Sequence, residues 1–345
     1  MTLAVQGRRP RMIGRSELTQ FALPLAFSLL ATLLLFTITP LSGGLGFVIV
    51  AYVVFLVAFF LYTRQAIGAK AGADRVVTVA ISSAAFLVIG ALLSIVIFVV
   101  GKGIAHLNTN FVTKTLEGLG PDQPQSAGGA LHALVGTLIQ VGAATAVAVP
   151  FGVMTAVYLH EIGGRLVPVV RVIVDAMSGL PSIVAGLFIY SVWVVGAKAG
   201  FSGLAASLAL GMLMLPTVAR TTEEMLKLVD PSLREASLAL GSPQWRVVWQ
   251  VVLPTARTGI VTAVILGIAR IAGETAPLLM TSFGNDRVSV KGFFNEPQSS
   301  LPLYIFQQFS LDRKNLAWAG ALLLVLIVLV LFLLARFIGR DRATR

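Results

Sequence analysis

The chain has 345 residues, of which 57% are hydrophobic and only 12% are charged. Soluble domains carry about 25% charged residues, so this composition excludes a chain that folds mainly in water and indicates repeated membrane spans. The formal net charge of +11 does not indicate nucleic-acid binding, because the basic residues lie mainly beside apolar runs, where they act as orientation signals.

Residue types that commonly bind metals are scarce. The chain has no cysteine, which excludes disulfides, iron–sulfur clusters and Cys-ligated zinc. The three histidines, His106, His132 and His160, are scattered and share no metal-ligand spacing. We therefore expect no metal site and no cofactor bound by this chain.

Eight apolar runs are long enough to cross a bilayer, which requires about 20 mostly apolar residues in a helix. The sequence therefore predicts an all-α, polytopic membrane protein with about eight transmembrane helices. The run that begins at Ala130 is longer than one span needs, so we expect it to tilt, kink or extend beyond the bilayer. In chain order the runs are Phe21–Leu41, Gly46–Tyr62, Val76–Val100, Ala130–Leu159, Leu166–Val195, Gly203–Ala219, Gly259–Met280 and Leu316–Phe337.

The basic residues outside these runs predict the orientation of the spans. Sixteen of them lie before the first span, after the last one, or in connections of the same side, and seven lie in the opposite loops. An excess of Lys and Arg marks cytoplasmic segments, so both termini are expected in the cytoplasm. Of the two long outer loops, the second contains Leu301–Phe309, a short amphipathic segment expected to lie on the surface.

The connection between the sixth and seventh spans, residues 221–257, predicts two helices on the cytoplasmic face. Pro231 suits the first turn of one helix, which runs to Leu240. Gly241 suits its C-terminal cap, and Ser242 is positioned to cap the helix that Pro243 opens. The pattern therefore predicts a helix, a tight turn and a second helix.

This connection resembles the EAA motif of ABC-importer permeases. Glu235-Ala236-Ser237 is followed by Gly241 and then by Val251-x-Leu253-Pro254, with Ser in place of the second Ala and Val in place of Ile. The resemblance implies a coupling loop that binds an ATPase subunit through Glu235, Ala236, Gly241, Leu253 and Pro254. The alternative is an ordinary amphipathic helix at the membrane surface.

Three further segments resemble the PstA-type permeases of phosphate ABC importers. They begin at Gly179 (GLPSIVAGLF), at Leu215 (LPTVARTTEEML) and at Ala269 (ARIAGETAPLL), and the likeness covers residues 76–338. The sister permease PstC shares parts of this pattern, but Glu274-Thr-Ala-Pro277 favours PstA. The resemblance implies an N-terminal two-span extension over residues 1–75, with a basic tail, and a permease region over residues 76–345. Its type I core is expected over about 130–337, and the extension departs from the usual six spans.

The resemblance implies a permease subunit that moves inorganic phosphate across the cell membrane and is not itself an enzyme. The sequence has no Walker A pattern, so ATP is expected to be used by a separate ATPase. The partners implied are a PstC-like permease, a PstB-like ATPase dimer and a PstS-like phosphate-binding protein, besides membrane lipid, with no nucleic acid. The alternatives are a permease for molybdate or sulfate, and a stand-alone secondary transporter or channel.

Charged residues in the spans provide a candidate path for an oxyanion. A charge at mid-bilayer costs roughly 2.5–3.5 kcal/mol on insertion scales, and Arg matches phosphate oxygens with a planar fork of donors. Such pairs could instead only neutralise each other for insertion. Three Arg–acid pairs at i, i+4 spacing are expected to share a helix face, and Glu223 accompanies one of them: Arg171 with Asp175, Arg220 with Glu224, and Arg270 with Glu274.

The fifth span is interrupted by Ser178-Gly179-Leu180-Pro181-Ser182. Proline removes a helical hydrogen bond and glycine loosens the helix. A broken helix can direct its positive N-terminal end toward an anion, so Ser178 and Ser182 join the candidate path. The alternative is a plain kink that fits neighbouring helices.

Overall fold

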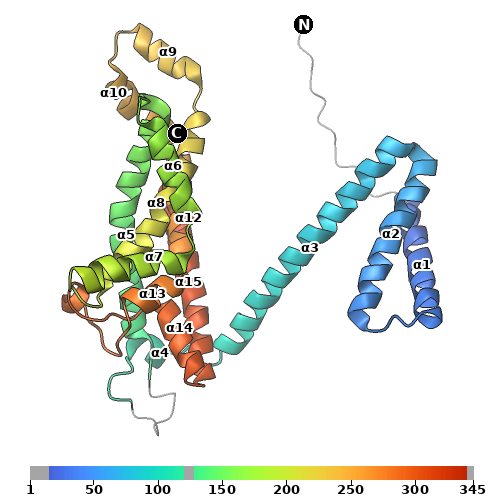
Figure 1. Cartoon of the computed structure of the whole chain (residues 1–345), viewed down its shortest axis with the longest axis horizontal. Coiled ribbons are helices and arrows are strands. Elements are labelled where there is room, and N and C mark those ends of the chain that lie inside the picture. Colours follow the sequence, from blue (N-terminus) through green and yellow to red (C-terminus); the bar gives the residue numbers. More distant parts are fainter. Residues whose placement is uncertain (1–14, 120–127, 340–345) are drawn as a thin grey trace. The chain divides into compact units, whose positions relative to one another are not determined.

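The computed structural model describes residues 15–119 and 128–339, and the regular elements within these ranges are all helices (Figure 1). The chain divides into two compact units, Met1–Val96 and Ile97–Arg345, and the predicted extension falls within the first. Part of the predicted orientation depends on basic residues that lie outside the described residues, namely Arg8, Arg9, Arg11, Arg340, Arg342 and Arg345.

The predicted all-α class is confirmed, and each of the eight apolar runs lies mostly in helices, with a break inside two of them. Short π-helical segments continue three of the helices: η2 (Tyr158–Ile162), η3 (Tyr190–Gly196) and η4 (Val248–Val252). The α-helices are α1 (Arg15–Ile38), α2 (Gly44–Ile67), α3 (Ala69–Gly103), α4 (Thr109–Thr113), α5 (Leu131–Val157), α6 (Val167–Ser178), α7 (Ser182–Ile189), α8 (Gly203–Lys227), α9 (Pro231–Ala239), α10 (Gln244–Val247), α11 (Leu253–Thr255), α12 (Arg257–Ala272), α13 (Ala276–Thr281), α14 (Leu301–Ser310) and α15 (Lys314–Gly339).

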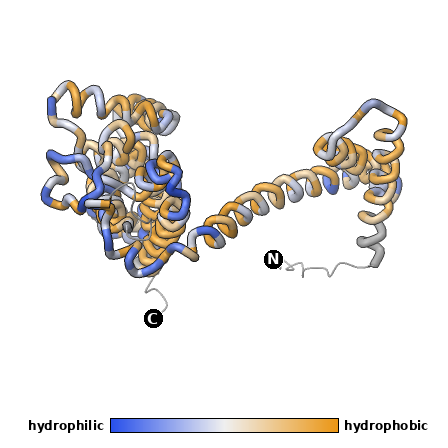
Figure 2. Tube along the Cα trace, turned by 90° about the horizontal axis from the view of Figure 1, so that it is seen from below, coloured by the Kyte–Doolittle hydropathy of each residue, from blue (hydrophilic) through white to orange (hydrophobic). Residues whose placement is uncertain are grey.

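The lengths and hydropathies of the helices agree with a protein of several membrane spans. Among the described residues, six helices are long and apolar enough to cross a bilayer, or eight if each of two bent helix pairs is one span. Figure 2 shows hydrophobic residues along most of these helices, with hydrophilic residues gathered at turns and helix ends. Helix α5 and η2 form one 32-residue span candidate, Leu131–Ile162, which agrees with the expectation that this run is longer than one crossing needs.

The first unit is built on a hairpin of α1 and α2. Its contact surface uses aromatic rings and small polar side chains, and Phe59 stacks on Phe21 with 4.8 Å between ring centroids. Two of its buried hydroxyls bond within their own helix: Ser28 Oγ donates to the Leu25 carbonyl at 2.8 Å, and Thr63 Oγ1 donates to the Phe59 carbonyl at 2.6 Å. Leu residues cover most of the remaining surface of α1 and are exposed, as expected where lipid is the solvent.

The core of the second unit lies where α8 packs against α5 and α12. Small residues let these helices approach closely: a Cβ added at Gly152 of α5 would lie 2.9 Å from Val218 Cγ1 of α8. Ala144, Ala148 and Ala206 are also fully buried in this contact. Close packing of small residues is the usual means by which membrane helices associate, since burial in lipid brings no hydrophobic gain.

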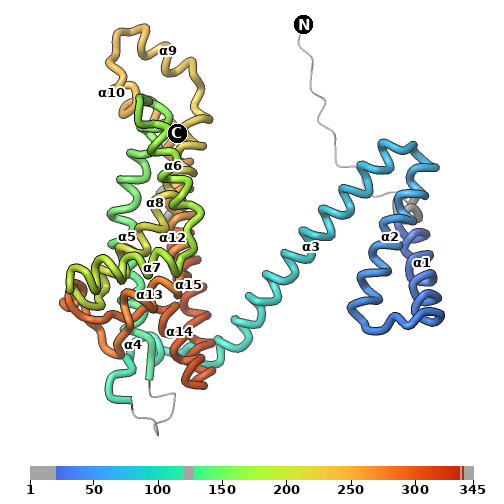
Figure 3. The backbone as a smooth tube through the Cα atoms, viewed as in Figure 1, coloured from blue at the N-terminus to red at the C-terminus, as the bar shows by residue number. Residues whose placement is uncertain are grey.

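Two span candidates are bent within the second unit, and one of them, Gln244–Thr255 with Arg257–Ala272, is bent by 71°. Helix α6 and the combined α7–η3 segment are bent by 105° at the predicted interruption, which confirms the break (Figure 3). The predicted span Gly259–Met280 is not one continuous helix, because α12 ends at Ala272 and α13 begins at Ala276. Pro277 supplies the reason, since a helical proline lacks its own N–H donor and its ring clashes with the carbonyl four residues earlier.

The predicted amphipathic segment forms α14, and one side of this helix is buried in the protein. Leu301, Leu303 and Tyr304 are fully buried, and α14 packs against α15. Its first residue is tied to α5, because the Leu301 N–H donates to Thr137 Oγ1 at 2.7 Å. One side of α14 therefore belongs to the protein core, while Phe306 and Phe309 are exposed.

The two short helices that follow the breaks, α7 and α13, pack directly on each other. A Cβ added at Gly186 would lie 2.6 Å from Pro277 Cα, closer than real Cβ contacts allow. We expect Gly186→Val to lower the free energy of unfolding by about 1–3 kcal/mol, because it overpacks this contact. Thermal unfolding of the purified protein in detergent would measure the change. Gly142→Val is the matched control, since a Cβ at Gly142 meets no atom within 4 Å, and an equal loss in both variants would contradict the assignment.

Candidate functional site

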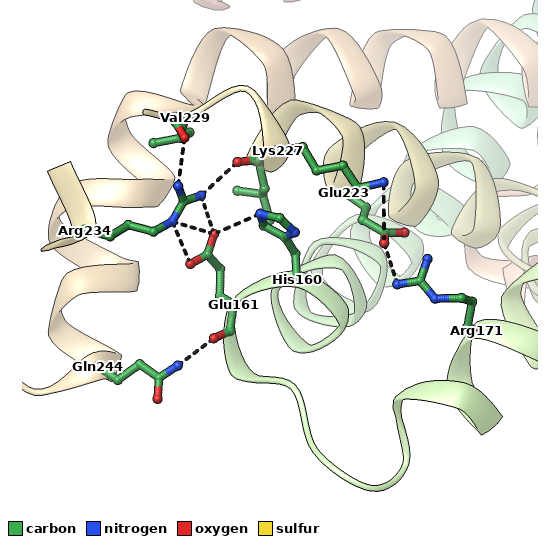
Figure 4. Close-up of polar contacts among 9 residues, drawn as sticks. His160, Glu161, Arg171, Glu223, Lys227, Val229, Arg234 and Gln244 are labelled. Carbon is green, nitrogen blue, oxygen red and sulfur yellow. Dashed lines mark hydrogen bonds and ion pairs between the residues drawn. The ribbon is translucent and has the colours of Figure 1, made fainter. Parts of the chain in front are cut away.

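A network of ion pairs joins α6 to the last two turns of α8, and Figure 4 shows Arg171, Glu223 and Lys227 of this network. Arg171 Nη2 of α6 lies 2.8 Å from Glu223 Oε1 of α8. Arg220 Nη1 lies 3.1 Å from Glu223 Oε2, and Arg220 also pairs with Asp175 of α6. Lys227 Nζ approaches Glu223 Oε1 at 3.9 Å. Five predicted or neighbouring residues thus form one cluster with Glu223 at its centre.

The pairing within this cluster differs from the prediction. The expected partners Arg171 with Asp175, and Arg220 with Glu224, are spaced for contact on one helix. Instead, Arg171 reaches Glu223 and Arg220 reaches Asp175, both across the α6–α8 contact. The reason is packing: α6 lies against α8, so the neighbouring helix offers a closer partner than the next turn. Glu224 lies outside the cluster on the exposed side and pairs with Lys227 at 2.7 Å.

Burial divides the members of this cluster into two classes. The Glu223 side chain is 1% exposed, whereas the side chains of Arg171, Arg220 and Lys227 are 38%, 30% and 42% exposed. A buried carboxylate needs compensating charge, and here it holds cations that keep part of their surface free. Glu223 and Asp175 therefore hold the two Arg side chains in place, and each Arg keeps donors available to an oxyanion.

The third predicted pair, Arg270 with Glu274, is not formed. Arg270 is in the last turn of α12, and its Nη1 donates to Thr217 Oγ1 of α8 at 2.9 Å. Glu274 follows the end of α12 and lies in the break before α13, so it no longer occupies the next turn of the same helix. Among the described residues, no cation lies within ion-pairing distance of Glu274. Both residues stay candidates for an anion path on separate grounds.

The serines at the first break have different surroundings. Ser178 ends α6, and its Oγ donates to the Val174 carbonyl at 2.8 Å, within its own helix. Ser182 is the first residue of α7 and is half-buried, with Pro181 at the N-cap. No side-chain hydrogen bond caps the N-terminus of α7 at this break. That an anion binds there stays a prediction.

The connection between α8 and α12, residues 228–256, has the predicted helix–turn–helix form. Pro231 opens α9, and Gly241 follows its end with φ of 80°. The Gly241 N–H donates to the Leu238 carbonyl at 2.9 Å and the Ser242 N–H to the Ser237 carbonyl at 3.2 Å, the two bonds of a Schellman motif. The predicted capping role of Ser242 is wrong, because the N-cap of α10 is Pro243 and no side-chain bond caps that helix.

The residues of the EAA resemblance lie along this connection. Glu235, Ala236, Gly241 and Pro254 are exposed, and Leu253 is half-buried. Large apolar side chains beside them are exposed as well, with Leu240 at 87% and Trp245 at 61%. Exposed anchors of this kind on a helix–turn–helix surface are typical of a protein interface.

The start of α9 has a side-chain cap whose strength depends on pH. Asp230 Oδ1 accepts the Ser232 backbone N–H at 2.9 Å. That bond, followed by the Ser232 hydroxyl, holds the pKa of Asp230 below its usual value of 3.8. Since the folded-state pKa is lowered, the cap stabilises α9 fully above the usual value and is lost as the pH falls through the folded-state pKa.

We therefore expect Asp230→Ala to increase amide hydrogen exchange in the first turn of α9 several-fold at neutral pH, because one helix cap is lost. Acid should produce the same increase in the unmodified chain, once every exchange rate is divided by the intrinsic rate at that pH, which falls steeply in acid. Asp230→Asn is the control: its amide oxygen still caps the helix but does not titrate in this range. Exchange in that variant should stay low at both pH values, and acid sensitivity equal to that of Asp230 would contradict the assignment.

The structure also reveals a polar contact that the sequence does not predict. Arg234 of α9 pairs with Glu161 of η2, with Nη2 and Oε1 2.7 Å apart (Figure 4). A single acid after a long apolar run, in Tyr158-Leu-His-Glu161, is the only local signal. It indicates a charged residue at the end of a span and gives no indication of its partner.

Comparisons with known proteins agree with this architecture. The family of binding-protein-dependent transport system inner membrane components matches residues 148–343. The phosphate transport system permease protein PstA 1 of Mycobacterium tuberculosis (strain CDC 1551 / Oshkosh) is 44% identical over 254 residues, which cover 72% of this chain and 82% of that protein. PstA of Haemophilus influenzae is 41% identical over 246 residues, 70% of this chain and 84% of that protein.

A solved structure shows the same fold. A chain of a bacterial ABC transporter for import of the acidic polysaccharide alginate matches with a TM-score of 0.50 and 14% identity, over 75% of this chain and 96% of that one. This chain therefore belongs to the family of binding-protein-dependent transport system inner membrane components, and within it to the PstA permeases.

Proposed function

We propose that the chain is a permease subunit of an ATP-driven importer that moves inorganic phosphate across the inner membrane of the cell. The observation that carries this proposal is the 44% identity, over 72% of the chain, to a permease named for phosphate transport. The family match covers residues 148–343, which contain the ion-pair network and the 228–256 connection.

The partly exposed Arg171 and Arg220 support phosphate as the cargo. Their guanidinium groups can bind phosphate oxygens bidentately, while Asp175 and Glu223 already occupy part of their donors. A passing anion would thus displace carboxylate contacts rather than enter a free binding site. Transport needs such weak binding, because a site that held its cargo tightly would not release it.

The same reading assigns the partners and the orientation. The chain would pair with a second, PstC-like permease, and the exposed face of the 228–256 connection would bind a PstB-like ATPase that uses the ATP. A PstS-like phosphate-binding protein would dock on the opposite side. The excess of basic residues beside this connection and at the two termini supports a cytoplasmic location for the connection and for both termini.

Uptake of labelled phosphate by cells that lack this chain, with and without its restoration, tests the proposal. We expect ATP-dependent uptake only when the chain is present, and little competition from excess molybdate or sulfate. Uptake that molybdate or sulfate abolishes would assign a different oxyanion. Uptake that follows an ion gradient and continues without ATP would instead support a stand-alone transporter.

A further inference from the structure

The 228–256 connection has two arms: α9 before the turn at Gly241, and α10 with η4 and α11 after it. Both arms contact one residue, Glu161, in the π-helical extension η2 of α5 (Figure 4). From the first arm, Arg234 Nη2 donates to Glu161 Oε1 at 2.7 Å and Arg234 Nε donates to Oε2 at 3.1 Å. From the second arm, Gln244 Nε2 donates to the Glu161 backbone carbonyl at 2.6 Å. Arg234 precedes the turn at Gly241 and Gln244 follows it, so Glu161 holds both sides of the turn.

The guanidinium of Arg234 makes further contacts. Its Nη1 donates to the Val229 carbonyl at 2.8 Å, and its Nη2 donates to the Leu226 carbonyl at 2.9 Å. Leu226 is in the last turn of α8, where carbonyl groups lack partners within the helix. One side chain of α9 thus binds both the end of α5 and the end of α8. The paired bonds from Arg234 to the Glu161 carboxylate are charge-assisted, and such bonds are about twice as strong as bonds between neutral groups.

This contact is shielded from water. The side chain of Arg234 is 19% exposed and that of Glu161 is 7% exposed. Beside the pair, a small apolar core contains Ala156 of α5, Leu226 of α8 and Val252 of η4, each fully buried. The end of α5, the end of α8 and η4 therefore share one packed contact, and Arg234 ties α9 to it through Glu161.

The opposite side of α9 is free. Glu235 directly follows Arg234 but points outward: it is exposed, and within the described parts of the chain no cation lies within ion-pairing distance of it. Leu240 is exposed too. One face of the connection is therefore attached to the membrane helices, while another is open to a partner.

We propose that Arg234 and Glu161 form a latch that attaches α9 to the end of α5, so that a displacement of α9 by a bound ATPase is passed to α5. The backbone joins the connection only to α8 and α12, so the latch is what attaches α9 to α5. Both are positioning residues, because neither contacts cargo. That an ATPase supplies the displacement rests on the proposed function, whereas the attachment of α9 does not.

Amide hydrogen exchange of α9 tests the attachment directly, in the complete transporter in lipid nanodiscs. We expect Arg234→Met and Glu161→Gln each to raise exchange in Pro231–Ala239 by about tenfold, the equivalent of one charge-assisted hydrogen bond. The double variant should exchange no faster than Arg234→Met alone, because that change already removes the Glu161 contact together with the bonds to the Val229 and Leu226 carbonyls. The matched control is Arg246→Met, an exposed residue of the same connection that stacks on Trp245 with 5.4 Å to the ring.

Phosphate moved per ATP hydrolysed tests what the latch transmits. We expect both latch variants to keep ATPase binding and hydrolysis but to move several-fold less phosphate per ATP. Arg234→Lys keeps the charge and loses the fork, so it should assemble normally and still lose coupling. This variant keeps the test valid if Arg234→Met fails to assemble.

The outcomes are separable. Unchanged exchange in α9, or single effects that add in the double variant, would overturn the latch. Raised exchange with wild-type phosphate moved per ATP would overturn its role in transmission. Absence of ATP-dependent phosphate uptake in the unmodified transporter would instead overturn the proposed function, and the exchange measurement would still decide whether the latch holds α9.

Discussion

Glu223→Gln is expected to lower phosphate uptake by about tenfold. Glu223 is the one buried carboxylate of the α6–α8 network, and it contacts Arg171 and Arg220 at 2.8 and 3.1 Å. Removing one partner of a buried pair costs up to about 3–5 kcal/mol. Because both Arg side chains are about one third exposed, solvent screens part of that cost, and about 1.5 kcal/mol is expected here. The Arg groups would then lose the anchor that positions them.

The neighbouring Glu224→Gln is the matched control, since it removes the same charge one residue later. Glu224 is 60% exposed and pairs only with Lys227 among the described residues, and exposed pairs contribute little. We expect near-normal uptake in this variant. Uptake should be measured at equal amounts of assembled transporter, so that a folding defect is not mistaken for a transport defect. Equal effects of the two changes would show that charge alone matters and that the buried network does not.

The spans were predictable because a membrane imposes a strong local rule. Each span needs a long apolar run, and α3, α5 and α15 lie where such runs do. The break after α6 was predictable for the same reason, since Gly179 and Pro181 are local signals. Pro277 is the same kind of local signal for the break after α12, and Glu274 and Thr275 interrupt the apolar run just before it.

The site was predictable as a set of residues but not as a set of contacts. Residues such as Arg171 and Arg220 are conspicuous in apolar surroundings. Their partners are set by the packing of α6 on α8, and spacing along one helix contains no information on that contact. Burial of Glu223 beside exposed Glu224 also follows from packing. For the same reason, Glu161 and Arg234, which are 73 positions apart, could not be paired from the sequence.

The helix–turn–helix connection was predicted almost in full, because its signals are local. The main error concerns Ser242: after a Schellman turn, this residue uses its backbone N–H to close α9 and leaves α10 without a side-chain cap. Gly241 has no such alternative, since its φ of 80° lies in the left-handed region. That position therefore offers the sharpest test of the connection.

We expect Gly241→Val to abolish most ATP-driven phosphate uptake and to weaken copurification of the ATPase. A β-branched residue in the left-handed region costs on the order of 1–3 kcal/mol, so the turn would open and α9 and α10 would lose their relative orientation. The exposed residues on either side, Leu240 and Trp245, would no longer form one surface. Uptake assays and a pulldown in mild detergent measure the two effects.

The control substitutes the same position with a residue that tolerates its backbone. Asn adopts the left-handed region more readily than other side chains, and an added Cβ at Gly241 meets no atom within 4 Å. Gly241→Asn should therefore keep most uptake and ATPase binding. If both variants fail equally, the partner itself requires the absence of a side chain, and the contact there is closer than turn geometry alone demands. If both transport normally, the turn at Gly241 is not part of the coupling surface, and the docking assignment for the connection is wrong.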